Sequence, residues 1–232
     1  MALLFLADEH YGTHAGRVLR EQLEDHYAFD FHEGDWTPLE NGPLNGKYEL
    51  LVLHMIAGTG RAPLPGERAS ANLKAWFEAG RNALLLHGSS AAFWHWDWWR
   101  PIVGFRWVRA NDPDGAAPSR HPTKPYAVKV AKCRHPLAAE LRDMDLPADE
   151  IYIGLEQTGP TVTLMETTIE EGTFPQCCLC ATPWGGTIAG FLPGHEPAVV
   201  ARPDLAANVR ALIDHLLNLG GERPAPFGGP GL

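Results

Sequence analysis

Residues 67–88, with the sequence ERASANLKAWFEAGRNALLLHG, contain the pattern that decides the fold class. The segment 67–79 suits a helix, and Gly80 is well placed to end it, because glycine readily adopts the left-handed conformation that follows many helices. The run at 83–86 is wholly apolar, as expected for a strand buried on both faces of a sheet. A helix that leads directly into such a strand predicts an α/β protein.

The same alternation of strand and helix continues on both sides of this stretch. Apolar runs at 2–7, 48–54 and 187–192 predict three more strands, which should lie beside 83–86 in one mainly parallel sheet. Helices predicted at 15–26, 67–79 and 203–219 should flank this sheet and give three layers. The remaining expected elements are strands at 27–32, 126–131, 161–166 and 175–181, a helical turn at 135–141 and an exposed loop at 111–124.

Length and charge narrow the class of protein. The 232 residues suit a single domain, expected to span 1–219, with a Gly- and Pro-rich tail at 220–232. A formal charge of −9 disfavours nucleic acid and anionic lipid membranes as partners. No apolar run approaches the roughly 20 residues that cross a bilayer, and the amino-terminal segment lacks the basic region of a signal peptide. We therefore expect a cytoplasmic protein.

The chain has four cysteines, Cys133, Cys177, Cys178 and Cys180, and Cys177 and Cys180 have the Cys-x-x-Cys spacing within the run CCLC. On a strand, Cys178 and Cys180 would share one face while Cys177 points to the other, which is a poor arrangement for chelating a metal. We interpret the cysteines as small buried apolar side chains, with a redox or zinc role as the alternative.

Histidines follow four of the predicted apolar strands. His10 comes shortly after the run 2–7, His54 ends the run 48–54, His87 follows 83–86, and His195 follows 187–192. The carboxyl ends of parallel strands lie at one edge of an open sheet, where ligands bind. We therefore predict that these histidines converge on one functional site. A hydrogen-bonded structural role is the alternative for each histidine taken alone.

Four motifs resemble the trehalose-utilisation (ThuA-like) family, in the order that the family has them. They are LKAWFEAGRNALLLHG, a Trp-rich segment ending in WWRPIVGF, the pair RHPLAAEL and DEIYIG, and TPWGGTIAGFLPGHEP. The resemblance implies the class I glutamine-amidotransferase-like fold, a three-layer α/β sandwich with a flavodoxin-like layout. In that superfamily a nucleophilic cysteine stands on the turn after a central strand, where this chain has His87. We therefore expect no glutaminase activity, because imidazole cannot form the required thioester.

The residues and the resemblance together indicate acid–base chemistry on a sugar. Imidazole titrates near neutral pH, and a buried carboxylate can be tuned towards it. We expect four catalytic side chains in one pocket: His87, His195, Glu150 and His135. Substrate-binding side chains are expected around them: His10, His14, His54, Tyr152 and Trp98. Trp98 belongs to the segment AAFWHWDWWR, which offers indole faces to a sugar or, as the alternative, packs internally or at a homo-oligomer contact.

The resemblance implies a small-molecule carbohydrate as substrate, and a keto group acidifies the neighbouring C–H bond. We therefore expect isomerisation, elimination or hydrolysis of a sugar or keto-sugar derivative. The alternative is a non-catalytic carbohydrate-binding or regulatory module on the same fold. Ser89 and Ser90 suggest a serine hydrolase only weakly, because the Gly-x-Ser-x-Gly elbow is missing. The sequence specifies no cofactor, although the His, Asp and Glu side chains would also suit a divalent metal ion.

Overall fold

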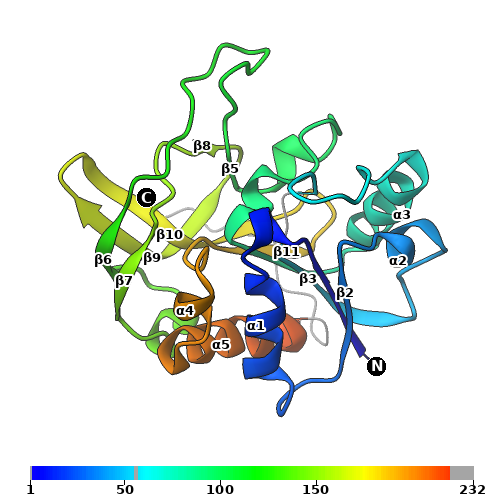
Figure 1. Ribbon diagram of the computed structural model, residues 1–232. Helices are drawn as coiled ribbons and strands as arrows, with labels where there is room; N and C mark the ends of the chain where they lie inside the picture. The colour runs from blue at the N-terminus through cyan, green and yellow to red at the C-terminus, as the bar shows by residue number, and fades with distance from the viewer. Residues whose placement is uncertain (1, 55–56, 220–232) are drawn as a thin grey trace.

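A nine-stranded sheet forms the central layer of the computed structural model, which describes residues 2–54 and 57–219 (Figure 1). The strand order is β2-β1-β3-β4-β11-β10-β9-β6-β7. These strands are β1 (Ala2–Ala7), β2 (Phe29–Glu33), β3 (Tyr48–His54), β4 (Ala83–Leu86), β6 (Thr123–Val130), β7 (Met144–Glu150), β9 (Thr161–Ile169), β10 (Gly172–Ala181) and β11 (Thr187–Phe191). A separate small sheet pairs β5 (Phe105–Arg106) with β8 (Glu156–Gln157).

The sheet is mixed, which corrects the expectation of a mainly parallel one. The four runs predicted to be neighbours are β1, β3, β4 and β11, and they lie side by side and parallel, as predicted. Strand β2 extends this half in parallel. The other half, β10, β9, β6 and β7, is antiparallel throughout. Short turns join β9 to β10 and β10 to β11, and the connections from β6 to β7 and from β7 to β9 contain no α-helix, so no helix periodicity marks this half of the sheet.

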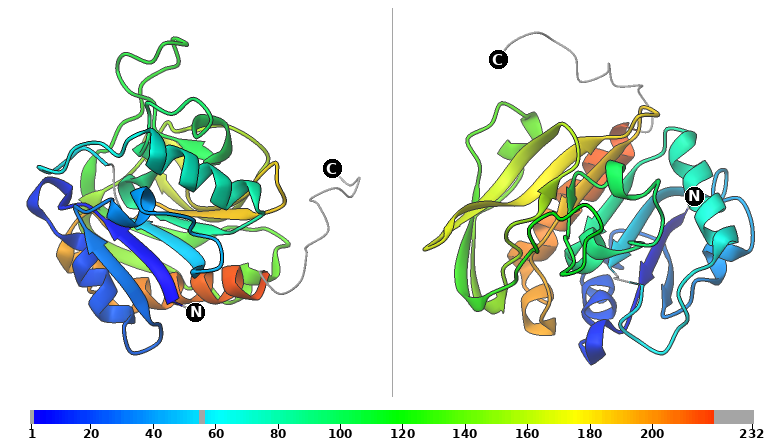
Figure 2. Two further views of the ribbon diagram at one scale, coloured as in Figure 1. Left: turned by 90° about the vertical axis from the view of Figure 1, so that its right-hand side faces the viewer. Right: turned by 90° about the horizontal axis from the view of Figure 1, so that it is seen from above.

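Side chains of the parallel strands alternate between two apolar cores, one on each face of the sheet. On β1, Leu3 and Phe5 belong to one core while Leu4 and Leu6 belong to the other. The first core is covered by α1 (Ala15–Leu23), α4 (Pro197–Val200) and α5 (Pro203–Leu219), and the second by α2 (Thr37–Glu40) and α3 (Glu67–Glu78). The left view of Figure 2 shows the resulting three layers, which confirm an α/β fold.

Most predicted boundaries lie within a few residues of those observed. Helix α1 stops at Leu23 rather than at residue 26. The turn predicted at 135–141 is a short 3-10 helix, η4 (Pro136–Ala139). Strand β7 was not predicted. The tail expected at 220–232 lies outside the described residues. Within the part of the chain that the structure describes, no helix combines the length and the apolar character needed to cross a membrane.

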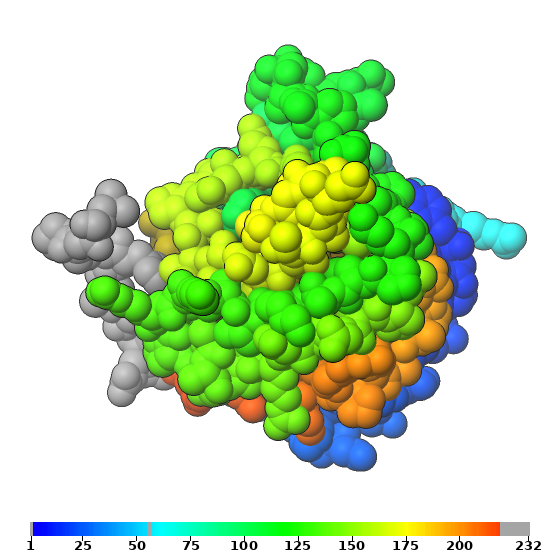
Figure 3. Space-filling view, turned by 90° about the vertical axis from the view of Figure 1, so that its left-hand side faces the viewer, coloured from blue at the N-terminus to red at the C-terminus, as the bar shows by residue number. Residues whose placement is uncertain are grey.

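The antiparallel half places a second set of polar residues at the edge where the parallel strands end. Alternating directions from β11 to β7 make β7 run the same way as β4, so Glu150 lies at the same edge of the sheet as His87. Strand β7 stands five places from β4, which in a flat sheet would separate them by about 24 Å. The sheet must therefore curl strongly to bring these two ends together. The loop 107–122, between β5 and β6, projects beyond this edge (Figures 1 and 3).

Candidate active site

His87 is the first residue after β4 and occupies the sharp turn into a 3-10 helix, η2 (His87–Ala91). Its φ angle is 44°, in the left-handed region that side chains other than glycine rarely adopt. The side chain is fully buried, and its Nδ1 lies 2.8 Å from the carbonyl oxygen of Leu192. Burial lowers the pKa of His87 below its ordinary value. Strain of this kind is retained mainly at functional sites.

His10 reaches the same point from the end of β1. Its φ is 40°, and its ring centroid lies 5.0 Å from that of His87 and 4.9 Å from that of His195. The carboxylate of Asp8 holds the turn in place, because its Oδ1 accepts the N–H of His10 (3.1 Å) and its Oδ2 the N–H of Ala57 (3.2 Å). Both ring nitrogens of His10 are buried without a hydrogen-bond partner among the described residues.

His195 is positioned by a carboxylate at the end of β7. Asp149 is completely buried. Its Oδ2 accepts the backbone N–H groups of Gly194 (2.9 Å) and His195 (3.3 Å), and its Oδ1 accepts that of Glu196 (3.0 Å). The Asp149 carboxylate thus accepts three charge-assisted hydrogen bonds, which fix the loop that carries His195. The imidazole Nδ1 lies 3.1 Å from Oε1 of Glu196.

Glu150 lies between the histidines. Its Oε2 is 3.5 Å from Nε2 of His87, and its Oε1 is 3.7 Å from Nε2 of His195 and 3.0 Å from Nδ1 of His121. Burial alone would raise the pKa of this carboxyl group. The contact with His87 and the positive charge that the surrounding imidazoles carry when protonated outweigh burial and hold the pKa of Glu150 below its usual value. The side chain is thus an ionised carboxylate at neutral pH.

The structure brings together five of the predicted side chains, those of His87, His195, Glu150, His10 and Tyr152. Two more, His54 and His14, lie at the margin of this cluster. Tyr152 packs its ring 4.6 Å from that of His87. His54 lies behind the cluster, with Nε2 3.3 Å from the carbonyl oxygen of Gly194, and burial lowers its pKa to about 3. His14 faces away, because its Nδ1 pairs with Oε2 of Glu33 at 3.0 Å.

Two predicted placements are wrong. His135 lies away from the cluster, where its ring contacts His215 of α5 at 5.2 Å. The Trp98 indole donates to Ser70 of α3 at 2.8 Å and stacks on Trp96, so it packs inside the Trp-rich segment. These side chains were assigned from local motifs, and the motifs do not show which edge of the sheet each one reaches.

Three residues at the site were not predicted from the sequence. His121 contacts Glu150 directly. Trp107 packs its ring 4.7 Å from Tyr152, and Arg109 lies with it at the mouth of the site. His121 precedes a proline, as His135 does, and this shared Arg-His-Pro sequence was the only signal that could have pointed to it.

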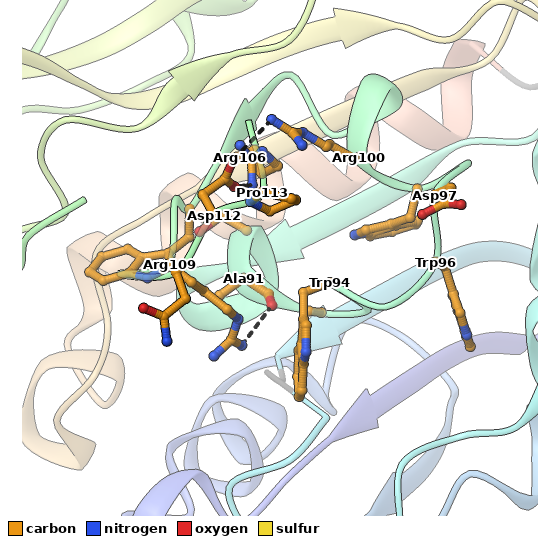
Figure 4. A pocket seen from close by; sticks show the side chains of 14 residues that line it. Ala91, Trp94, Trp96, Asp97, Arg100, Arg106, Arg109, Asp112 and Pro113 are labelled. Atoms are coloured by element: carbon orange, nitrogen blue, oxygen red, sulfur yellow. Dashed lines mark hydrogen bonds and ion pairs between the residues drawn. The ribbon is translucent and has the colours of Figure 1, made fainter. Parts of the chain in front are cut away.

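Two adjoining cavities open above the cluster. One, of about 120 Å³, is lined by side chains that include His10, Glu150, Tyr152 and His121. The other, of about 150 Å³, is lined by the Trp-rich segment and by Arg100, Arg106 and Asp112 (Figure 4). Three residues line both cavities: Ala91, Trp107 and Arg109. The two cavities therefore form adjoining parts of one site.

Arg109 marks the junction of these cavities. Its guanidinium lies 3.9 Å from the ring centroid of Trp94 and donates to the carbonyl oxygen of Ala91 at 3.3 Å (Figure 4). No carboxylate among the described residues pairs with it within 4 Å. Its remaining N–H groups can therefore contact a ligand, while its guanidinium covers one face of the Trp94 ring.

Fold and site together define an α/β protein with a mixed sheet and a histidine on the turn after a central strand. A model of the trehalose utilisation (ThuA) family matches residues 3–213, and the chain belongs to this family. The resemblance drawn from the four motifs is thereby confirmed.

Solved structures show the same fold. A ThuA-like protein from Parabacteroides merdae ATCC 43184 has 16% identity and a TM-score of 0.70, over 99% of this chain and 93% of that one. A ThuA-like protein from Bacteroides uniformis ATCC 8492 has 13% identity and a TM-score of 0.65, over 93% and 91%. A β-galactosidase from Rahnella sp. R3 has 12% identity and a TM-score of 0.54, over 93% of this chain and 31% of that one. No curated protein matches the sequence.

Proposed function

We propose that the protein is an enzyme that performs acid–base chemistry on a sugar or keto-sugar derivative, by isomerisation, elimination or hydrolysis. The observation that carries this proposal is the position of Glu150, whose two carboxylate oxygens lie 3.5 and 3.7 Å from Nε2 of His87 and of His195. One ionised base and two imidazoles converge on one point. A dispersed set would have favoured a binding module instead.

The arrangement divides the work of proton transfer. A carbonyl group acidifies the C–H bond on the neighbouring carbon, and the Glu150 carboxylate is positioned to take that proton. The imidazoles of His87 and His195, when they are protonated on Nε2 as well as Nδ1, are positioned to stabilise the negative charge that develops on the carbonyl oxygen. Returning the proton to the adjacent carbon gives isomerisation, and expelling a leaving group gives elimination.

The cavity beside the cluster supports a carbohydrate as the substrate. Aromatic faces stack on the apolar face of a sugar ring, and the Trp94 ring, which is 45% exposed, lines the larger of the two cavities. Asp97 and Arg109 line the same cavity and suit the hydroxyl groups of a sugar. The proposed substrate therefore extends from this Trp- and Arg-lined cavity to Glu150.

Glutamine hydrolysis is not part of the proposed function. The family resemblance implies that His87 stands on the turn where an amidotransferase has its cysteine, and three of the cysteines, Cys177, Cys178 and Cys180, are buried within β10. The hydroxyl of Ser89 donates to the carbonyl oxygen of Leu53 at 2.9 Å, a contact that anchors the turn and supports a structural role for this serine.

Proton exchange with solvent tests the proposal directly. Keto sugars prepared from trehalose and other glucosides are incubated with the protein in D₂O, and deuterium at the carbon next to the carbonyl is followed by NMR. The wild type should catalyse exchange, and Glu150→Gln should lower the rate by about a hundredfold to ten-thousandfold. Glu171→Gln, on the β9–β10 turn, is the matched control and should exchange like the wild type. Tight sugar binding with no exchange would favour the binding module.

A further inference from the structure

Two imidazoles of the site present an unprotonated nitrogen to the same carboxylate. Nδ1 of His87 lies 2.8 Å from the carbonyl oxygen of Leu192, which can only accept, so Nδ1 carries the hydrogen. Nδ1 of His195 lies 3.1 Å from the carboxylate of Glu196 and donates for the same reason. In each neutral ring the other nitrogen, Nε2, then has a lone pair that faces Glu150.

No hydrogen bond joins these facing groups. The distances of 3.5 Å from His87 and 3.7 Å from His195 to the Glu150 oxygens exceed those of an N–H···O hydrogen bond, which runs to about 3.2 Å. Nε2 of His87 has no hydrogen-bond partner among the described residues. Two lone pairs and a negative carboxylate therefore border a common space, and a cation in that space would satisfy all three.

His10 adds a third nitrogen to this space. The side chain is buried, Nδ1 is 3.7 Å from Oδ1 of Asp8, and neither ring nitrogen has a hydrogen-bond partner among the described residues. One nitrogen from each of His10, His87 and His195 lies within 4.8 Å of the others. Native proteins rarely leave several buried polar atoms unsatisfied at one point unless a ligand joins them.

We propose that His10, His87 and His195 bind one divalent transition-metal ion beside the Glu150 carboxylate. Imidazole nitrogens favour ions of the Zn²⁺ type, whereas Mg²⁺ and Ca²⁺ prefer oxygen. The contacts of Nδ1 with Leu192 and Glu196 are outer partners of the kind that orient metal-binding histidines.

The metal site deepens the proposed function and rests on it for its role in catalysis. A metal ion at this point would polarise the carbonyl oxygen of a keto sugar, while Glu150 takes the proton from the neighbouring carbon. The binding of the ion itself does not depend on the identity of the substrate. It can therefore be tested without one.

The test uses the full-length protein without a histidine tag, after treatment with a chelator. Zn²⁺ binding is measured by calorimetry and Co²⁺ binding by visible absorption, and one ion should bind per chain. His87→Ala and His195→Ala should each weaken Zn²⁺ binding by at least about a hundredfold, and Glu196→Gln by about tenfold to a hundredfold. His135→Ala is the matched control and should bind Zn²⁺ like the wild type. Mg²⁺ should not compete.

Two results would overturn the metal site: wild-type protein that binds neither ion, or His195→Ala protein that binds Zn²⁺ as tightly as the wild type. His195 is only partly buried, whereas His87 is fully buried, so this variant keeps the test valid if His87→Ala fails to fold. Zn²⁺ binding without deuterium exchange would refute the proposed enzyme and leave the metal site. Exchange by protein that binds no ion would refute the metal site and leave the enzyme.

Discussion

Asp149→Asn is the substitution that most directly tests how the site is held together. The wild-type carboxylate accepts three backbone N–H groups from residues 194–196 and is completely buried. Asparagine has nearly the same shape, but one of its two terminal groups is an NH₂ donor and it carries no charge. The substitution therefore changes the hydrogen bonding and leaves the packing almost unaltered.

The expected loss of stability depends on which oxygen of Asp149 is replaced by the NH₂ group of asparagine. With the amide oxygen at the Oδ2 position, the bonds to Gly194 and His195 remain but weaken, and the NH₂ group meets the N–H of Glu196. A hydrogen bond to a charged group contributes about 1.5–3 kcal/mol, and a buried unsatisfied donor costs about 1–3 kcal/mol. We expect the free energy of unfolding to fall by about 3 kcal/mol.

Urea unfolding followed by circular dichroism measures this change. Asp145→Asn is the matched control, because it makes the same substitution on the same strand at a side chain that is 86% exposed. Its ion pair with Lys129 is a surface contact, for which a loss below about 1 kcal/mol is expected. The reasoning is refuted if the two variants unfold within about 1 kcal/mol of each other.

Three further outcomes follow from the packing. Gly16→Ala would bring a Cβ atom within 2.6 Å of the Cβ of Ala7, and the free energy of unfolding measured in urea should fall by about 1–3 kcal/mol. In the control variant Gly159→Ala, the added Cβ meets nothing within 4 Å, so its stability should be nearly unchanged. Burial raises the pKa of Cys178 to about 12, so mass spectrometry should find it alkylated by iodoacetamide only after unfolding. His54 has a pKa of about 3 when folded and about 6.5 when unfolded. Between these two pH values the unfolded chain binds a proton that the folded chain does not. The free energy of unfolding should therefore fall as the pH drops from 6.5 towards 3, by up to about 1.4 kcal/mol per pH unit. The variant His54→Asn should lack this part of the pH dependence.

The parallel half of the fold could be predicted because its signals are local. Each of β1, β3, β4 and β11 is buried on both faces, so each appears in the sequence as a continuous apolar run. Parallel strands end at one edge, and this rule alone placed His10, His54, His87 and His195 together. The convergence of these four histidines could therefore be predicted without knowing the antiparallel half of the sheet.

Strand β7 could not be predicted because it lies at the edge of the sheet. Its sequence, MDLPADE, contains Pro147 and three acidic residues, and only Met144, Leu146 and Asp149 are buried. Proline is tolerated on an edge strand, where no neighbour needs its missing N–H group. The position of Glu150 beside His87 depends in addition on the curl of the whole sheet, which no local pattern encodes.

The choice between two Arg-His-Pro sequences shows where local motifs stop being informative. One begins at Arg120 and the other at Arg134, and strand β6 lies between them. The motif that contains His135 predicted the second of these sequences to lie in the site. Strand β6 is antiparallel to β7, and its first residue, Thr123, pairs with Glu150. The histidine that precedes β6 is therefore brought to Glu150, while His135, which follows β6, is carried to the opposite edge of the sheet. Identical tripeptides differ in role because the strand between them spans the sheet, so the direction of β6 decides which histidine reaches the carboxylate.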